Sequence, residues 1–285
     1  MINRKSLSIK YNFFRHRLFY PLISVLVALS ICLSTALPSQ AFDWLPILLQ
    51  GVQVLQLSNM SDRQEADIGK QINQQLLGDV RLYRNSDINR YVEQLGQRLA
   101  ANSDRPKLKY TFQVVEDDSI NAFATLGGYV YLHTGLIKTA ENEAELASVI
   151  AHEIGHIGGK HLIKQMRQKA IDEGLLTAAG LDRSTAVQIG YQLVRKLPGS
   201  RKNEFDADKR GLKTLTSAGY DQSAMVAFMQ KLVSKRSVPT FLSTHPATGD
   251  RIDAIKRAIN TQPSNGNNGL DNAAYKANIQ ALLRS

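Results

Sequence analysis

Cysteine is almost absent from this chain of 285 residues, which has a single one, Cys32. Because Cys32 lies in an apolar stretch near the N-terminus that we expect to be removed on export, the mature chain is predicted to have no thiol. This excludes disulfide bonds, thiolate zinc ligands and a cysteine nucleophile from its function. Arginine-rich clusters interleaved with aromatic residues are also missing, so no nucleic-acid partner is predicted.

Acidic residues are missing from the first 41 positions. This segment has five basic residues, then the uncharged stretch 18–37, and it ends in Pro38-Ser39-Gln40-Ala41. Such an order is typical of a secretory signal peptide, predicted here at 1–41, although an apolar stretch of this length could also remain as a membrane anchor. Removing it lowers the net charge from +10 to +5, and a positive excess of this size requires no nucleic-acid partner. We expect an exported chain, in the periplasm or another extracytoplasmic compartment.

A second apolar run long enough to cross a membrane is missing from the sequence. Residues 42–57 are strongly apolar, but Pro46 and Gly51 interrupt them. We interpret 42–60 as a lead-in segment that packs on the outside of the domain. Peripheral contact of this segment with a membrane surface is the alternative.

The remaining chain is predicted to form one mainly helical α+β domain at 61–260, because apolar residues recur at helical spacing in most of its segments. Two overlapping capping boxes at 61–65 begin a helix that ends near Leu77. Strand signals at 109–115, 122–124 and 129–133, with Gly127-Gly128 as a hairpin turn, predict one small antiparallel sheet. Further helices are expected at 86–101, 143–156, 161–176, 184–197, 201–217, 221–234 and 248–259. Residues 261–285 are expected to form an unpacked polar linker and a short C-terminal helix.

The most informative pattern is His152-Glu153-Ile154-Gly155-His156, at the end of a run of apolar and small residues typical of a buried helix. Helical spacing puts the two histidines one turn apart on one face, so both imidazoles can bind one ion. Glu153 lies beside them and is free to act as a general base. The pattern predicts one zinc ion (Zn2+) per chain. The small predicted sheet is expected to lie next to the helix that carries this pattern.

A zinc site of this kind needs a third protein ligand. The pattern H-E-x-x-H-x-x-G-x-x-H does not supply it, because the next histidine, His161, comes one position early. In the segment 203–208, Glu204 and Asp208 share a helix face, whereas Asp206 points elsewhere. Glu204 is then the candidate third ligand, and Asp208 the candidate acceptor for the second nitrogen of a ligating histidine. A solvated acidic helix face is the alternative, and His161 is expected to have a structural or supporting role.

Several sequence blocks occur in an order that resembles one known family. They are His152-Glu-Ile-Gly-His156, Ser200-Arg-Lys-Asn-Glu204-Phe-Asp-Ala207-Asp208, Ser217-Ala-Gly-Tyr-Asp221, Ser243-Thr-His245-Pro246 and Arg251-Ile252, preceded by Asn121-Ala-Phe-Ala124, Gly127-Gly128 and Gly135-Leu136. Over residues 58–260 the chain is similar to the gluzincin metallopeptidases of family forty-eight. This family includes HtpX, the CAAX prenyl proteases and the BepA-type and Oma-type envelope proteases. The similarity is to soluble exported members without tetratricopeptide repeats.

This resemblance implies a zinc metalloendopeptidase with a zincin fold, which cleaves extended or unfolded polypeptides in envelope protein quality control. It implies Glu204 as the third zinc ligand. It also favours His245 and Arg251 as groups that stabilise negative charge on the substrate carbonyl oxygen. Alternatively, His245 occupies the open position of zinc at rest and is displaced by substrate.

Peptidases of this plan hold an extended chain against a sheet edge. The expected edge consists of Gly127, Gly128, Tyr129, Val130 and Tyr131, because paired glycines allow close backbone approach. The alternative function is a chaperone-like protein that binds unfolded envelope proteins in the same groove with little proteolysis. The intact general base favours the enzyme, because a binding protein has no need for it.

Overall fold

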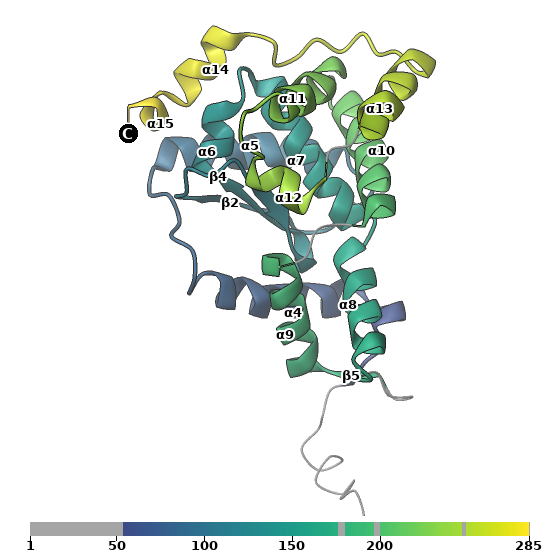
Figure 1. Ribbon diagram of the computed structural model, residues 1–285. Helices are drawn as coiled ribbons and strands as arrows, with labels where there is room; N and C mark the ends of the chain where they lie inside the picture. Colours follow the sequence, from purple (N-terminus) through teal and green to yellow (C-terminus); the bar gives the residue numbers. More distant parts are fainter. Residues whose placement is uncertain (1–53, 176–179, 197–199, 247–248, 285) are drawn as a thin grey trace, which may run out of the picture. The chain divides into compact units, whose positions relative to one another are not determined.

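The computed structural model describes residues 54–175, 180–196, 200–246 and 249–284 (Figure 1). The predicted signal peptide at 1–41 and the lead-in segment up to residue 53 lie outside them. The described end of the lead-in packs on the domain: β1 (Val54–Leu55) pairs antiparallel with β5 (Leu181–Asp182), and Leu57 and Met60 are buried. None of the described helices combines the length and the hydropathy that crossing a membrane requires.

The main sheet has the strands β2 (Thr111–Val115), β3 (Ala122–Ala124) and β4 (Tyr129–His133), in the order β2-β4-β3. β4 runs antiparallel to β3 and parallel to β2. The predicted antiparallel sheet is therefore wrong for one of the two strand pairs, and the sheet is mixed. The reason is the strand order. β3 lies at the outer edge, and after the hairpin turn β4 lies between β3 and β2 and runs in the same direction as β2.

Gly127 and Gly128 form the hairpin turn between β3 and β4, as predicted. Both have positive φ, 72° and 87°, which favours glycine, and a Cβ on Gly128 would lie 2.3 Å from the carbonyl oxygen of Lys109. The prediction that residues 127–131 form a sheet edge is wrong, because β4 is the central strand and is paired on both sides. β3 is the edge strand on that side of the sheet.

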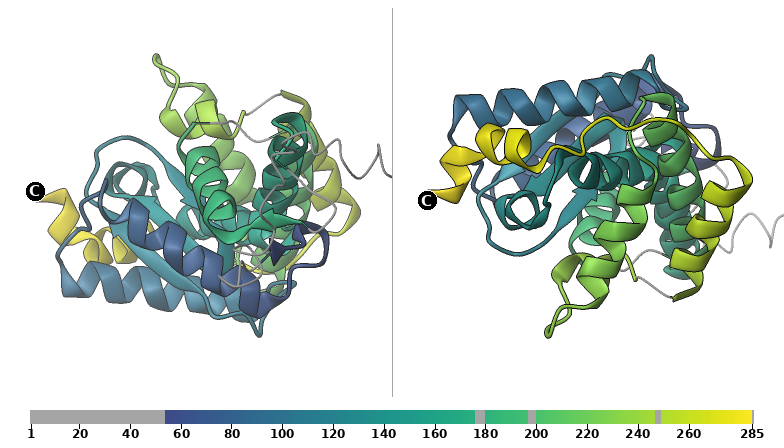
Figure 2. Two further views of the ribbon diagram at one scale, coloured as in Figure 1. Left: turned by 90° about the horizontal axis from the view of Figure 1, so that it is seen from below. Right: turned by 90° about the horizontal axis from the view of Figure 1, so that it is seen from above.

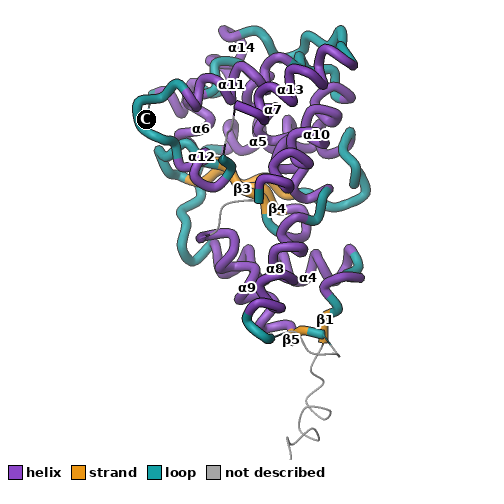
Figure 3. Tube along the Cα trace, turned by 45° about the vertical axis from the view of Figure 1, so that its right-hand side comes forward, coloured by secondary structure: helices purple, strands orange, loops and turns teal. Residues whose placement is uncertain are grey.

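The two faces of the sheet are covered by different helices (Figure 3). Val130 and Leu132 point into the core shared with α5 (Ser86–Ala101) and α7 (Glu143–Gly158). Tyr131, between them in sequence, points to the opposite face, as strand pleating requires. There it packs with α4 (Asp62–Leu76), and its hydroxyl donates to Asn73 Oδ1 at 2.7 Å.

The predicted helices are present, with small differences at their ends. The capping box that begins α4 is confirmed, since Ser61 Oγ accepts from the Gln64 backbone N–H and Gln64 Oε1 accepts from the Ser61 N–H. A short 3-10 helix, η2 (Leu57–Asn59), precedes it. The other helices are α6 (Thr134–Thr139), α8 (His161–Asp172), α9 (Arg183–Lys196), α10 (Arg201–Ser217), α11 (Ser223–Val233), α12 (Thr240–Thr244), α13 (Gly249–Thr261), α14 (Asn272–Asn278) and α15 (Gln280–Leu283).

The C-terminal segment packs on the domain, contrary to the expectation of an unpacked linker and helix. Tyr275, Ile279 and Leu282 are buried in the main core, and the Tyr275 hydroxyl donates to the Ile137 carbonyl oxygen at 2.7 Å. α14 lies beside α5 and α15 beside α6, as can be followed in Figure 2. These three apolar side chains, spread over α14, α15 and the residue between them, are enough for packing, and the polar linker before them led to the expectation of an unpacked segment.

Candidate metal centre

The site is built where α7 crosses α10. The crossing is close because glycine stands at both contact points: a Cβ on Gly155 would lie 2.5 Å from the Ala207 carbonyl oxygen, and one on Gly211 would lie 3.0 Å from the backbone of His152. Asn142 caps α7 by accepting from the Glu145 N–H, and Ser200 caps α10. The crossing brings the first turn of α10 to the end of α7 that carries the two histidines.

His152, His156, Glu204 and His245 form a group that we call the metal group. His152 Nε2 and His156 Nε2 lie 3.0 Å apart. The Glu204 carboxylate faces both, with Oε2 at 3.4 Å from His152 Nε2 and Oε1 at 3.5 Å from His156 Nε2. His245 Nδ1 lies 3.3 Å from Glu204 Oε2. One atom of each side chain can therefore be chosen so that all four lie within 4.8 Å of one another.

The metal group suits a zinc ion. Its donors are imidazole nitrogens and a carboxylate oxygen, which are ligands that zinc prefers in catalytic sites. Glu204 Oε1 is buried and has no hydrogen-bond donor among the described residues, so a cation would satisfy it. Burial opposes ionisation of Glu204, but hydrogen bonds from His152 and His245 hold its pKa well below the ordinary value, so the carboxylate is charged.

Glu153 is fully buried next to the metal group. Its Oε1 lies 3.5 Å from His245 Nε2. Burial raises the pKa of Glu153 above the ordinary value of a glutamate, because the charged carboxylate is poorly solvated. A raised pKa makes this carboxylate a better proton acceptor, which is the property that a general base needs.

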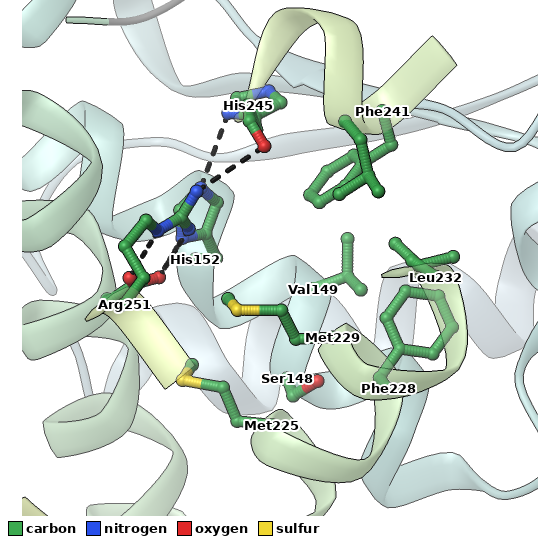
Figure 4. Close-up of a pocket in the computed structure, with 12 residues that line it drawn as sticks. Ser148, Val149, His152, Met225, Phe228, Met229, Leu232, Phe241, His245 and Arg251 are labelled. Atoms are coloured by element: carbon green, nitrogen blue, oxygen red, sulfur yellow. Dashed lines mark hydrogen bonds and ion pairs between the residues drawn. The ribbon is translucent and has the colours of Figure 1, made fainter. Parts of the chain in front are cut away.

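Asp208 and Arg251 hold the ligands in place. His152 Nδ1 and Asp208 Oδ1 lie 3.0 Å apart, so His152 presents its other nitrogen, Nε2, to the metal group. Burial alone would lower the pKa of His152, but hydrogen bonds with Asp208 and Glu204 raise it to about 9. Arg251 is buried and donates to both Asp208 oxygens at 2.7 Å, and its Nη1 lies 3.0 Å from Glu204 Oε2. Figure 4 shows that Arg251 also faces His245, whose carbonyl oxygen accepts from Nη1 at 3.4 Å. Arg251 therefore contacts two of the predicted residues, Asp208 and Glu204, with its guanidinium group.

His161 supports His156, a partner that the sequence analysis did not assign to it. His161 Nδ1 lies 3.0 Å from His156 Nδ1, and His161 Nε2 lies 2.9 Å from Asp206 Oδ2. Lys160, at φ 52°, lies between α7, which ends at Gly158, and α8, and it turns the chain so that the first residue of α8 points back at the site. Asp206 points away from the metal group, as predicted, and its carboxylate faces His161 instead. The glycine at position 159 leaves room for this arrangement, because a Cβ there would lie 2.2 Å from His161 Nε2.

Comparisons with known proteins agree with this site. The model of peptidase family M48 matches residues 86–259, which contain the whole metal group. The chain is 34% identical over 236 residues to the putative beta-barrel assembly-enhancing protease of Vibrio cholerae, covering 76% of this chain and 49% of that protein. It is 33% identical over 224 residues to the beta-barrel assembly-enhancing protease of Escherichia coli strain K12, covering 72% and 46%.

A more distant relative is the mitochondrial metalloendopeptidase OMA1 of Schizosaccharomyces pombe, 31% identical over 175 residues, or 58% of this chain and 51% of that protein. The chain spans about half the length of the curated relatives it matches. The family match covers most of the described domain, and the buried histidine and carboxylate donors are those of a zinc site. The chain therefore belongs to peptidase family M48.

Proposed function

We propose that the chain is a zinc metalloendopeptidase in which His152, His156 and Glu204 hold the ion. The observation that carries this proposal is the convergence of these three side chains beside the buried carboxylate of Glu153. Zinc, when bound there, acts as a Lewis acid. Glu153 takes a proton from the attacking water and returns it to the leaving amine nitrogen of the substrate. Asp208 fixes the orientation of His152 through the hydrogen bond to Nδ1.

His245 has two roles in this proposal, at different stages. At rest it completes the metal group, a role supported by the distance of 3.4 Å between its Nδ1 and His152 Nε2. When substrate enters, His245 moves aside and its imidazole stabilises the negative charge on the carbonyl oxygen. Arg251 supports this loop by donating to the Pro246 carbonyl oxygen at 2.8 Å. A direct contribution of Arg251 to charge on the substrate stays a prediction.

The substrate is proposed to be an extended or unfolded polypeptide that adds a strand to β3. This strand is paired with β4 on one side only, and it lies next to α7. The outer edge of β2 is less accessible, because Tyr83 N–H donates to the Val114 carbonyl oxygen there. Main-chain hydrogen bonds to β3 would bind many sequences, as expected for a protease that acts on damaged proteins.

We place this activity outside the cytoplasm, in envelope protein quality control. The support is the predicted signal peptide at 1–41 together with relatives that are named for enhancing beta-barrel assembly. The apolar part of the lead-in segment at 42–53 is proposed to make peripheral contact with a membrane surface.

Cleavage of unfolded casein by the purified, zinc-loaded chain tests the proposal. Glu153→Gln removes the proton acceptor and keeps the size of the side chain, so we expect one zinc per chain and at least a hundredfold slower cleavage. Undiminished cleavage would contradict the mechanism. Prevention of casein aggregation by this variant, together with absent cleavage by the unmodified chain, would instead indicate a chaperone-like function.

A further inference from the structure

The outer face of α8 ends in two exposed apolar side chains. Lys164, Arg167 and Ile171 lie on this face at helical spacing, and Leu175 follows just beyond the helix. We call these four residues the α8 surface. Ile171 is 44% exposed and Leu175 is 41% exposed, whereas apolar side chains on the opposite face of α8 are buried in the core. The α8 surface thus combines two cations with two apolar side chains that the described part of the domain leaves exposed.

The backbone at the end of α8 holds Leu175 in this exposed position. Gly174, at φ 66°, donates to the Ile171 carbonyl oxygen at 3.0 Å, and the Leu175 N–H donates to the Ala170 carbonyl oxygen at 2.8 Å. Helices often end with this pair of hydrogen bonds, and an apolar residue after the glycine then usually packs against the helix. Here Leu175 stays exposed although its backbone is fixed. A partner that buries these side chains therefore does not have to order a flexible loop first.

The α8 surface lies at the corner of the domain where the N-terminal part of the chain enters. β1 follows directly after the apolar segment 42–53, and it pairs with β5, the strand that comes after α8 (Figure 1). Leu57, just after β1, is buried in one cluster with Met166 and Ala170 of α8. The two apolar stretches of the N-terminal part, 18–37 and 42–53, are therefore joined to the domain at the α8 surface.

The charges on the outer side of α8 favour an anionic partner. Lys164 and Arg167 are exposed, and neither has an acidic partner within ion-pair distance among the described residues. Glu173, at the end of the helix, is paired with Lys169, so their charges cancel. The two free cations exceed the remaining acid, Asp172, by one charge. Attraction to anionic lipid therefore adds to the burial of the apolar side chains.

We propose that the α8 surface binds an anionic phospholipid bilayer, with Ile171 and Leu175 at the boundary between the headgroups and the acyl chains. A bilayer is favoured over a protein partner because the apolar stretches joined to β1 bring this corner of the domain to a membrane, where the local lipid concentration is high. The contact involves the folded domain itself, beyond the contact proposed for the lead-in segment.

The position of α8 links this contact to the metal group. α8 begins at His161, which contacts His156, and Ile171 lies about 15 Å along the helix from there. The metal group is then held close to the bilayer, where it acts on polypeptides near the membrane surface. This consequence for the substrate rests on the proposed peptidase function, whereas the lipid contact does not.

Fluorescence at the end of α8 tests the lipid contact without any cleavage. Ile171→Cys, in the full zinc-loaded chain with Cys32→Ser, receives an NBD label, and the vesicles are phosphatidylcholine with about 30% phosphatidylglycerol. We expect a blue shift of the emission when vesicles are added, and quenching by lipid that has a nitroxide at the start of its acyl chain. The control label at Gln94→Cys, on the exposed face of α5, should show neither change.

Equal signals at the two positions, or no blue shift at position 171, would overturn the proposal. A blue shift at position 171 that needs no vesicles and grows with protein concentration would also overturn it, because a second copy of the chain would then cover the α8 surface.

Charge reversal provides a second test. Lys164→Glu combined with Arg167→Glu should raise the lipid concentration needed for half of the blue shift at least about tenfold. The matched control is Lys256→Glu combined with Arg257→Glu, an exposed pair on α13 with the same charge change, and it should leave this concentration unchanged. Equal effects of the two pairs would refute recognition of anionic lipid by the α8 surface.

Casein cleavage in solution separates this inference from the peptidase function. The Lys164→Glu and Arg167→Glu chain should cleave casein at the rate of the unmodified chain, because neither residue lies in the metal group. Lipid contact without casein cleavage would support the α8 surface and refute the peptidase function. Casein cleavage without lipid contact would do the reverse. Thermal unfolding temperature and zinc content check that each variant is folded.

Discussion

The Nδ1 atoms of His156 and His161 lie 3.0 Å apart, in a hydrogen bond that fixes the tautomer of both rings. His156 turns Nε2 to the metal group, so its Nδ1–H donates to His161 Nδ1. His161 then carries its proton on Nε2 and donates it to Asp206, which also accepts from Arg210 Nε at 2.7 Å. A chain of three side chains behind His156 thus holds the imidazole in the ligating orientation.

His161→Phe should weaken zinc binding about 10- to 100-fold, because the His156 ring loses the acceptor that orients it. Competition with a chromogenic zinc chelator measures the affinity. The matched control is His133→Phe, which replaces another buried histidine whose Nδ1 bonds to Ser119 Oγ at 2.8 Å, away from the metal group. Equal zinc affinities for the two variants would show that His161 does not support the site.

The short distance between α7 and α10 at Gly155 predicts that a larger residue there weakens zinc binding. A Cβ on Gly155 would meet the Ala207 carbonyl oxygen at 2.5 Å, so Gly155→Ala must push α10 away, and Glu204 moves with it. We expect at least tenfold weaker zinc binding and lower stability. Gly158→Ala, in the same helix, would meet nothing closer than 3.7 Å and should leave zinc affinity unchanged. A variant at 155 that binds zinc normally would contradict this account of the crossing.

Periodic and locally encoded features of the fold could be predicted from the sequence. Helix α4, which Ser61 caps, has its capping box, and the Gly127-Gly128 hairpin has the positive φ values that favour glycine. The mixed sheet could not be predicted in this way, because strand order depends on long-range packing that periodicity does not encode. The same limit led to the wrong assignment of 127–131 as an edge.

In the site, too, features encoded by local sequence could be predicted, and those that depend on long-range packing could not. The spacing of His152 and His156 on one helix, and of Glu204 and Asp208 on another, follows from helix geometry, so their roles could be proposed from the sequence. The contact of His161 with His156 depends on the turn at Lys160 and on the angle between α7 and α8, which no local pattern specifies.

Arg105 forms a buried ion pair that ties α4 to the end of α7. Its guanidinium donates to both Glu65 oxygens, at 3.0 and 2.9 Å, and to the Ile157 carbonyl oxygen at 3.2 Å. Arg105→Met removes the two hydrogen bonds that the guanidinium donates to the buried Glu65 carboxylate and leaves Lys160 Nζ, at 4.0 Å, as the only cation near it among the described residues, so we expect a loss of about 3–5 kcal/mol in the free energy of unfolding. Urea denaturation measures it. Arg90→Met, in an exposed pair with Asp87, should cost less than about 1 kcal/mol.

Stability should fall in mild acid partly because of His133. Burial lowers the pKa of this imidazole below 6.5, although Asp117 opposes the shift. Below pH 6.5 the unfolded chain therefore binds a proton that the folded chain binds only at lower pH, so the stabilising contribution is present above pH 6.5 and is lost as the pH falls. His133→Gln should flatten the decline in unfolding free energy between pH 7 and 5 by at most about 1.4 kcal/mol per pH unit.

Ser119→Ala is the control for this pH effect, because it removes a hydrogen-bond partner of His133 and keeps the titrating ring. Its stability should decline with the slope of the unmodified chain. An unchanged slope in His133→Gln would assign the acid sensitivity to other groups.

The central claim is that His152, His156 and Glu204 hold a zinc ion. X-ray diffraction from crystals of the zinc-loaded chain, recorded on both sides of the zinc absorption edge, locates the ion directly. We expect a single anomalous peak about 2.0–2.2 Å from His152 Nε2, His156 Nε2 and an oxygen of Glu204. A peak bound elsewhere, for example by His161 and Asp206, or no zinc at the metal group, would contradict the account.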